Sequence, residues 1–322
     1  MSILTSSLLS VLLCLQPAID EDQVPWPVKL GARALHRTNQ IPLIDQVVVV
    51  PDLDTWIDEM AQWSTEGHWP VLLEDDHFAP MLIRTLKPAQ VIQRAPVTPP
   101  DLAMMDRFQL VLAKAWGGRP GESFAAAMTR QNLKPLGLVL TSESSPSFPA
   151  AMALAVGRGQ AVGQLDGSLG GGGTVLNASK TMALIELVRS RCEETGLQWD
   201  ILGDDIDAIT ICRTLPSRVR AELPASDRVK APNVGPEDPL AITDVLGRRT
   251  DWKRYAIVGW INGDAVESTY MAMSSLFVVP KTAWLCDGDP TGGQQPQYGM
   301  AEAAAKLSQD GYECLLGGNA TM

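Results

Sequence analysis

Short runs of hydrophobic residues alternate along the chain with segments whose hydrophobic positions recur at helical spacing. The clearest run is Val47–Val50, an unbroken β-branched stretch of the kind that a parallel sheet buries on both faces. Residues 52–63 follow with hydrophobic residues three and four positions apart, and Pro70–Leu73 is a second continuous hydrophobic run. A strand, a helix and a strand joined by short polar turns are typical of a βαβ unit.

The same alternation predicts helices and strands through much of the remaining chain. Further helices are predicted at residues 78–86, 148–156, 179–192, 266–277 and 301–307. Further strands are predicted at residues 89–92, 138–140, 160–165, 208–212, 255–258, 282–286 and 312–316. The sequence therefore predicts an α/β protein built from repeated Rossmann-like βαβ units, with mainly parallel sheets in three layers.

Changes in composition predict how these elements group along the 322 residues. A proline-containing lead-in segment and three α/β units are expected, with a linker before the third that carries Pro232 and Pro236. The predicted boundaries are 19–45 for the lead-in, 46–134 for the first unit, 135–226 for the second, 227–245 for the linker and 246–322 for the third.

Two segments of the first and second units share one order of elements. Val47–Asp75 and Leu138–Asp166 both run through a hydrophobic strand, a polar turn, a helix, a short glycine-containing loop and a second strand, and both end in acidic residues. Identity between them is low, so the match is one of pattern. This pattern predicts an internal duplication.

Both segments resemble the extracellular cell-wall-binding repeats of Gram-positive surface proteins. Those repeats run from a strand through a polar turn with Phe-Pro to an alanine-rich helix and a strand with an acidic end. Here the closest residues are Phe148–Gly159, with the sequence Phe-Pro-Ala-Ala-Met-Ala-Leu-Ala-Val-Gly-Arg-Gly. The first copy lacks both the Phe-Pro and the alanine-rich helix, and the resemblance covers about a fifth of the chain. It implies stacked βαβ units that serve surface binding without catalysis.

The charge of the chain changes the range of expected partners. Lys and Arg number 26 against 37 Asp and Glu, which gives a formal net charge of −11. An acidic protein repels phosphate backbones, whose binding depends on cationic side chains. The nearest approach to a basic cluster, Arg213–Arg220, is short and is interrupted by Pro216. No nucleic-acid partner is therefore expected.

The first residues predict a leader. The apolar run Ile3–Leu15 is followed by Pro17 and the small residue Ala18, an arrangement that resembles a secretory signal peptide over residues 1–18. The protein is then exported to the periplasm, the cell surface or the medium; the alternative is a cytoplasmic protein with a buried first element. No other run approaches the roughly 20 apolar residues of a membrane span, so none is expected in the mature chain.

The five cysteines show neither a CxxC pair nor a zinc-knuckle spacing. They are Cys14, Cys192, Cys212, Cys286 and Cys314. The last four lie on or beside hydrophobic stretches, where a free cysteine behaves as a small buried hydrophobic residue. Buried thiols are therefore favoured over the alternative of two disulfides in an oxidising compartment.

A glycine-rich tract, Gly167–Thr174, precedes the helix predicted from Ser179. The tract resembles a loop that holds phosphate at a helix N-terminus. A Walker loop, however, places glycine directly before Lys-Thr, and here Ser179 precedes Lys180. We interpret the tract as a flexible loop, and no organic cofactor is predicted.

Acidic clusters lie where strands end or are about to begin, on the side of a parallel sheet that usually binds ligands. Their carboxylates could bind a divalent cation such as Ca²⁺ or Mg²⁺, although none has the twelve-residue calcium-loop spacing. The candidate ligands are Asp75, Asp76, Asp204, Asp205, Asp287 and Asp289.

Cys286 is the candidate nucleophile, because it ends a predicted strand in the way that caspase-like and gingipain-like hydrolases place their cysteine. Such chemistry needs a histidine base, for which His77 is the candidate, but all three histidines lie in the first quarter of the chain. The sequence therefore favours a non-catalytic binding or interaction protein of the cell envelope or extracellular space, with an envelope or protein partner. The alternative is a secreted hydrolase with its site around Cys286.

Overall fold

The computed structural model describes residues 41–167, 170, 173–199, 208–220, 239–247, 256–278, 282–286, 300–309 and 311–317. The predicted signal peptide, most of the lead-in segment and the first part of the predicted linker lie outside these residues. Contacts divide the chain into two units, Met1–Leu276 and Phe277–Met322, and each is described by itself.

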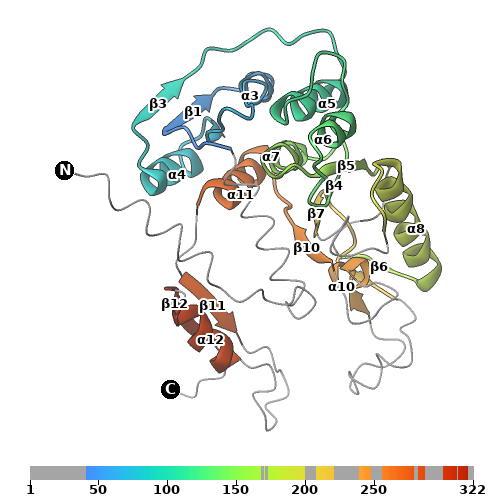
Figure 1. Ribbon diagram of the computed structural model, residues 1–322. Helices are drawn as coiled ribbons and strands as arrows, with labels where there is room; N and C mark the ends of the chain where they lie inside the picture. Colours follow the sequence, from blue (N-terminus) through green and yellow to red (C-terminus); the bar gives the residue numbers. More distant parts are fainter. Residues whose placement is uncertain are drawn as a thin grey trace, which may run out of the picture. The chain divides into compact units, whose positions relative to one another are not determined.

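The first unit consists of two parallel sheets, a small third sheet and the helices between them (Figure 1). Its strands are β1 (Gln46–Val50), β2 (Val71–Leu73), β3 (Gln90–Gln93), β4 (Leu138–Thr141), β5 (Ala161–Gln164), β6 (Val175–Leu176), β7 (Ala208–Cys212), β8 (Arg218–Val219), β9 (Leu240–Ala241) and β10 (Ile257–Trp260). Its helices are α3 (Leu53–Met60), α4 (Phe78–Leu86), α5 (Met104–Ala115), α6 (Phe124–Arg130), α7 (Phe148–Arg158), α8 (Ala178–Glu194), α10 (Ile242–Gly247) and α11 (Ala265–Phe277).

The first sheet has the strand order β2-β1-β3 and is parallel throughout. Val48 of the central strand lies opposite Val71 on one side and Ile92 on the other. Val47, Val48 and Val50 are fully buried, as the unbroken hydrophobic run predicts. Asp52 caps α3 by accepting a hydrogen bond from the backbone N–H of Thr55, at 2.8 Å, so the helix begins at the predicted place.

The second sheet has the order β10-β7-β4-β5 and is also parallel. Because parallel crossovers are right-handed, the return from β5 to β7 places α8 on the face opposite α7. Figure 1 shows α7 and α11 on one side of this sheet, with α8 and α10 on the other. The predicted α/β fold with parallel sheets between helices is therefore confirmed.

The two segments predicted to be duplicated both form βαβ units. β1, α3 and β2 make the first, β4, α7 and β5 make the second, and the strands of each pair are parallel. In the first sheet β3 pairs with β1 on the side opposite β2. In the second sheet β7 pairs with β4 on the side opposite β5. Descent of the two units from one ancestral segment stays a prediction.

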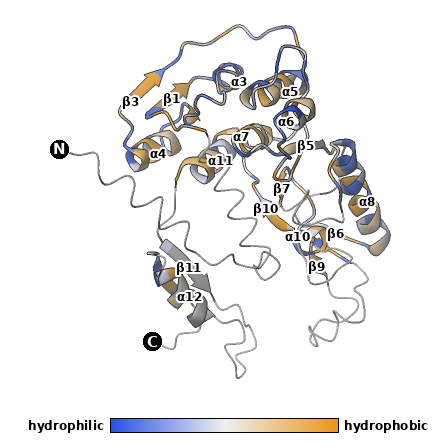
Figure 2. Ribbon diagram, viewed as in Figure 1, coloured by the Kyte–Doolittle hydropathy of each residue, from blue (hydrophilic) through white to orange (hydrophobic). Residues whose placement is uncertain are grey.

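Helix α7 is the centre of the hydrophobic core. Every residue from Phe148 to Val156 is buried, so the helix lacks a solvent-facing side. It packs on β4 and β7 and against α5. The hydropathy colours of Figure 2 show how it differs from α8, along which hydrophilic residues recur.

Helices α5 and α6 lie in a part of the chain for which the sequence predicted no element. Phe108 of α5 makes an edge-to-face contact with Phe148 of α7, with 5.6 Å between ring centroids. The indole N–H of Trp116 donates to the carbonyl of Val156, at 2.7 Å. Arg107, also of α5, pairs with Asp54 of α3. This helix therefore joins the elements around the first sheet to those around the second.

The small sheet has the order β6-β8-β9, and its last pair is antiparallel. β9 and the start of α10 lie within residues 239–245, which belong to the predicted linker. The predicted third unit, 246–322, is divided between the two units of the structure.

The second unit contains β11 (Thr282–Cys286), α12 (Met300–Gln309) and β12 (Glu313–Gly317). Its two strands are parallel, with Ala283 opposite Cys314 and Cys286 opposite Gly317. In the part of the chain that the structure describes, none of the helices has the length and hydrophobicity needed to cross a bilayer.

Candidate functional site

Loops at the carboxyl ends of β4, β5, β7 and β10 form what we call the strand-end region, at residues 142–147, 165–167, 213–214 and 261–264. The chain goes from β4 to β5 on one side and then returns to β7 on the other. The topological switch point therefore lies between β4 and β7. Open parallel sheets bind their ligands outside the carboxyl ends of the strands at such a point.

Hydroxyl groups tie these loops together. Thr141 and Ser145 both donate to the carbonyl of Cys212, at 3.0 and 3.2 Å. Ser147, which is fully buried, donates to the carbonyl of Gly263 at 3.1 Å. Thr214 forms a further bond with the side chain of Asn262, at 3.2 Å. These hydroxyls are thus engaged in fixing the positions of three strand-end loops.

Arg213 follows β7 and is the buried charged side chain of this region, whereas Glu143, Asp166 and Asp264 are not buried. Only 7% of the surface of Arg213 is exposed. Its Nη2 donates to the carbonyl of Gly167 at 2.9 Å, and its Nε lies 3.4 Å from the carbonyl of Thr214. Burial lowers the pKa of the guanidinium, and the nearby Asp166 carboxylate raises it. The indole N–H of Trp260 in turn donates to the backbone carbonyl of Arg213, at 2.9 Å.

A cleft of about 470 Å³ lies beside β5, and we call it the edge cleft. β5 is the last strand of its sheet, and Figure 1 shows it between α6 and α8. The backbone N–H groups of Ala161 and Leu165 donate to Gly137 and Thr141 on the β4 side. By strand alternation, the backbone groups of Val162 and Gln164 point the other way. The lining residues are Met105, Gln109, Leu112, Ser123, Phe124, Ala125, Ala161, Val162, Gly163, Gln164, Asp166, Arg191, Glu194 and Thr195.

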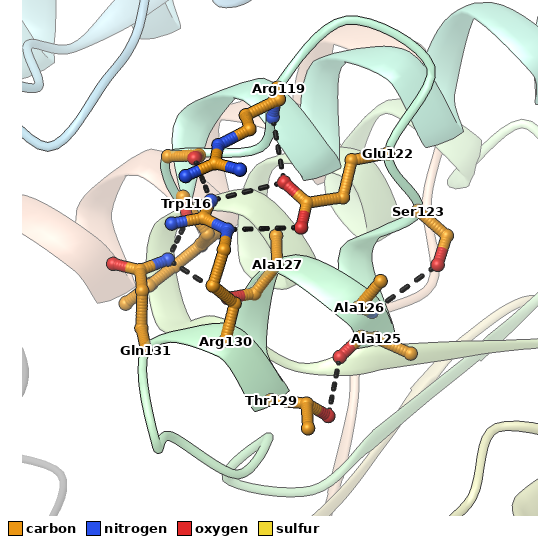
Figure 3. Close-up of polar contacts among 11 residues, drawn as sticks. Trp116, Arg119, Glu122, Ser123, Ala125, Ala126, Ala127, Thr129, Arg130 and Gln131 are labelled. Atoms are coloured by element: carbon orange, nitrogen blue, oxygen red, sulfur yellow. Dashed lines mark hydrogen bonds and ion pairs between the residues drawn. The ribbon is translucent and has the colours of Figure 1, made fainter.

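The α6 wall of the edge cleft is held by polar contacts (Figure 3). Arg130 donates to both carboxylate oxygens of Glu122, each at 3.0 Å, and to the carbonyl of Gly117 at 2.6 Å. The two bonds from Arg130 to this carboxylate, together with the backbone N–H of Arg119, lower the pKa of Glu122 to about 2. Ser123 accepts from the backbone N–H of Ala126 and so caps the helix at the cleft. The wall thus has a fixed geometry.

The structure gives the predicted metal ligands different roles or leaves them outside the described residues. Asp75 accepts hydrogen bonds from the backbone N–H groups of His77, Phe78 and Ala79, so its carboxylate caps α4. Asp76 is exposed. Asp204, Asp205, Asp287 and Asp289 lie outside the described residues. Within the described ranges, the structure brings together no group of three metal-binding side chains.

The alternative catalytic pair is split between the two units. Cys286 ends β11 as the sequence predicted, in the second unit, whereas His77 is exposed next to α4 in the first. The ring of His77 makes an edge contact with Phe78, with 4.8 Å between centroids. The catalytic role of Cys286 stays a prediction.

The predicted buried thiols are confirmed for Cys192 and Cys212. Both side chains are fully buried. Burial raises the pKa of the Cys212 thiol to about 12, against a smaller lowering by the Arg158 guanidinium. Cys314 is free and half-buried. A thiol as hard to deprotonate as Cys212 is unsuited to nucleophilic attack at neutral pH.

Comparison of the chain with protein-family models gives no match, and comparison with curated proteins gives none either. The candidate site is therefore assigned from its own geometry. The sequence missed Arg213, which it placed in a basic cluster, and it missed α5 and α6, which line the edge cleft together with the predicted helix α8. The position of Arg213 directly after a predicted strand could have marked it as a strand-end residue. The burial of its side chain, however, depends on the strand order, which local sequence does not contain.

Proposed function

We propose that this protein is a non-catalytic binding protein of the cell envelope or extracellular space, whose edge cleft takes an extended segment of a protein partner. One observation carries the proposal: a cleft of about 470 Å³ lies along the open edge of β5. Its volume falls within the range of roughly 300–1,000 Å³ that is usual for binding sites.

The edge cleft offers the groups that strand addition requires. Val162 and Gln164 present backbone N–H and carbonyl groups that β4 does not use, and an added strand can pair with them. Gly163 has no side chain; a Cβ there would lie 3.0 Å from the Cβ of Arg191. Polar side chains of Gln109 and Arg191 line the walls, where they can contact the side chains of the added segment.

Two features of the sequence support the cellular location. The run Ile3–Leu15 resembles a secretory leader, and Phe148–Gly159 resembles cell-wall-binding repeats that serve surface binding.

The test uses random peptides displayed on phage as the probe. Peptides selected on the whole protein are expected to slow the amide hydrogen exchange of Val162 and Gln164. Val162→Pro removes one N–H on the open side of β5, where proline is tolerated. It should weaken the binding of these peptides about tenfold, the effect of one lost hydrogen bond.

Val91→Pro is the matched control. Val91 lies in β3, an edge strand of the other sheet. Three residues later, Arg94 donates its backbone N–H to the carbonyl of Val49 in β1. By alternation, the N–H of Val91 also points away from its sheet. Peptide binding should survive this change. Selected peptides that protect other residues, or that bind Val162→Pro as tightly as the natural protein, would contradict the proposal.

A further inference from the structure

The buried guanidinium of Arg213 has a nitrogen that the fold does not use. Its Nη1 is out of contact with solvent and has no hydrogen-bond partner among the described residues. Its Nη2 holds the carbonyl of Gly167, at 2.9 Å, and its Nε makes the long contact of 3.4 Å with Thr214. Both N–H bonds of Nη1 and one of Nη2 are therefore left over.

The topology places this guanidinium at the switch point of the second sheet. Arg213 begins at the end of β7, and Gly167 follows the end of β5. Since β4 lies between these strands, the side chain crosses the carboxyl end of β4. The next residue after β4 is Ser142, which is buried and forms a hydroxyl–hydroxyl bond with Ser144 at 3.2 Å.

Comparison with Arg107 shows what Arg213 lacks. Arg107 is equally buried, at 6% exposed, but it pairs with the carboxylate of Asp54 and also donates to the carbonyl of that residue. For Arg213 no described carboxylate lies within ion-pair distance, and Asp166 acts on it only through space. A buried charge with an unused donor is unfavourable unless an oppositely charged partner satisfies it. An anion that reached this nitrogen would therefore stabilise the site.

Gly167, whose carbonyl accepts from the buried Arg213, lies at the surface. It is exposed, has a φ of +79°, and would meet no atom within 4 Å if it carried a Cβ. A Cβ on Gly170 would lie 3.3 Å from the side chain of Pro216, so Gly170 approaches the segment that follows Arg213.

We propose that Arg213 binds the carboxylate group of a small ligand at the switch point between β4 and β7. Nη1 offers two free N–H groups and Nη2 one, and the planar donors of a guanidinium suit the two oxygens of a carboxylate. One negative charge balances one guanidinium, and a multiply charged phosphate is less favoured in a chain of net charge −11. The proposal is independent of the edge cleft and adds a small-molecule site to the proposed partner binding.

The test titrates the whole protein, labelled with ¹⁵N at arginine side chains, with sodium acetate and sodium succinate. Sodium phosphate and sodium sulfate form the comparison, with sodium chloride holding the ionic strength constant. Acetate and succinate are expected to shift the Arg213 guanidinium signal, which is identified by its loss in Arg213→Lys. They should also raise the melting temperature of the natural protein and not that of Arg213→Lys.

Arg107→Lys is the matched control, because it changes an equally buried arginine that has its own carboxylate. It should keep the response to acetate, whereas Arg213→Lys should bind acetate at least about tenfold more weakly. If none of the arginine side-chain signals of the natural protein shifts with any of the four anions, the proposal is overturned, and this result needs no variant that folds. Shifts with phosphate or sulfate alone would overturn the carboxylate assignment. Val162→Pro should leave the Arg213 response intact, so failure here and failure of the edge-cleft proposal are separate results.

Discussion

Arg94, at the end of β3, donates to the buried carboxylate of Glu59 in α3, with 2.8 Å between Nε and Oε2. The same carboxylate accepts from the indole N–H of Trp69 at 2.9 Å and from the side-chain amide of Gln62 at 3.1 Å. Glu59 is 2% exposed, and its hydrogen bonds tie together three segments around the first sheet. The cluster is therefore a structural support of that sheet.

Loss of this carboxylate should destabilise the protein more than loss of its partner. Glu59→Ala leaves the Trp69 indole without its acceptor, and we expect the free energy of unfolding to fall by about 2–4 kcal/mol. Arg94→Ala should cost less, about 1 kcal/mol, because 39% of the Arg94 side chain is exposed to solvent. Urea unfolding measures both values. Equal losses in the two variants would show that Glu59 has no special role.

The pH dependence of stability should carry the signature of His68. This side chain is 6% exposed and stacks on Trp63, with 4.4 Å between ring centroids, and burial lowers its pKa to about 4. Between pH 6.5 and pH 4 the unfolded chain binds a proton that the folded protein does not. Stability should therefore be complete above pH 6.5 and fall by about 3 kcal/mol as the pH drops to 4. Urea unfolding across this pH range measures the slope.

His68→Phe separates this effect from other titrating groups. The phenyl ring can keep the stacking but cannot take up a proton, so the slope between pH 6.5 and 4 should become shallower. Glu122 acts in a different window, because its pKa is lowered to about 2 and its contribution is lost only as the pH falls below its ordinary value. If His68→Phe keeps the full slope, the pH dependence belongs to other groups.

Thiol reactivity should sort the cysteines by burial. Cys192 and Cys212 are expected to react with iodoacetamide in the folded protein far more slowly than after unfolding, because the thiolate is the reactive form and burial opposes it. Half-buried Cys314 should react faster than either. Mass spectrometry of each cysteine-containing peptide over time gives the rates. Fast labelling of Cys212 at neutral pH would contradict its raised pKa.

The same experiment tests the hydrolase alternative at Cys286. We expect this thiol to be structural, and Cys286→Ser to reduce stability by about 1–3 kcal/mol while peptide binding persists. Rapid alkylation of Cys286 at neutral pH would oppose this expectation. A hydrolytic activity that disappears in a folded Cys286→Ser variant would place the hydrolase function ahead of the binding function.

Export makes a prediction about the N-terminus of the native protein. The run Ile3–Leu15 and the small Ala18 indicate cleavage near residue 19. Mass spectrometry of the protein purified from its own cells should find a new terminus there. A chain that retains Met1 or Ser2 and is recovered from the cytosol would rule out the leader.

Elements with a strong hydrophobic pattern could be predicted from the sequence alone. The unbroken run of β1 and the residues of α4 were predicted at or within one residue of their observed bounds. Helix α5 was missed because the long polar and proline-rich segment before it obscured where a helix begins. The strands β6, β8 and β9 have two residues each, which is too short for any periodicity to be visible.

The candidate site depended on information that local sequence does not contain. Arg213 stands beside Arg218 and Arg220 in the sequence, where its charge suggests a solvated surface. Only the strand order shows that its side chain crosses β4 to reach Gly167. The edge cleft likewise exists because β5 ends its sheet and because α6 and α8 lie on either side of that end.

Because α7 is buried on all sides, fragments of the first unit that separate it from its neighbours should not fold. A fragment that stops near residue 134, where composition alone suggests a boundary, would lose α7 and leave the faces of α5 that pack against Phe148 and Val156 open to water. A fragment that starts there would keep α7 but lack its cover. Homologous chains should consequently keep or lose together the parts of this unit before and after residue 134. Insertions should instead occur in the surface loops.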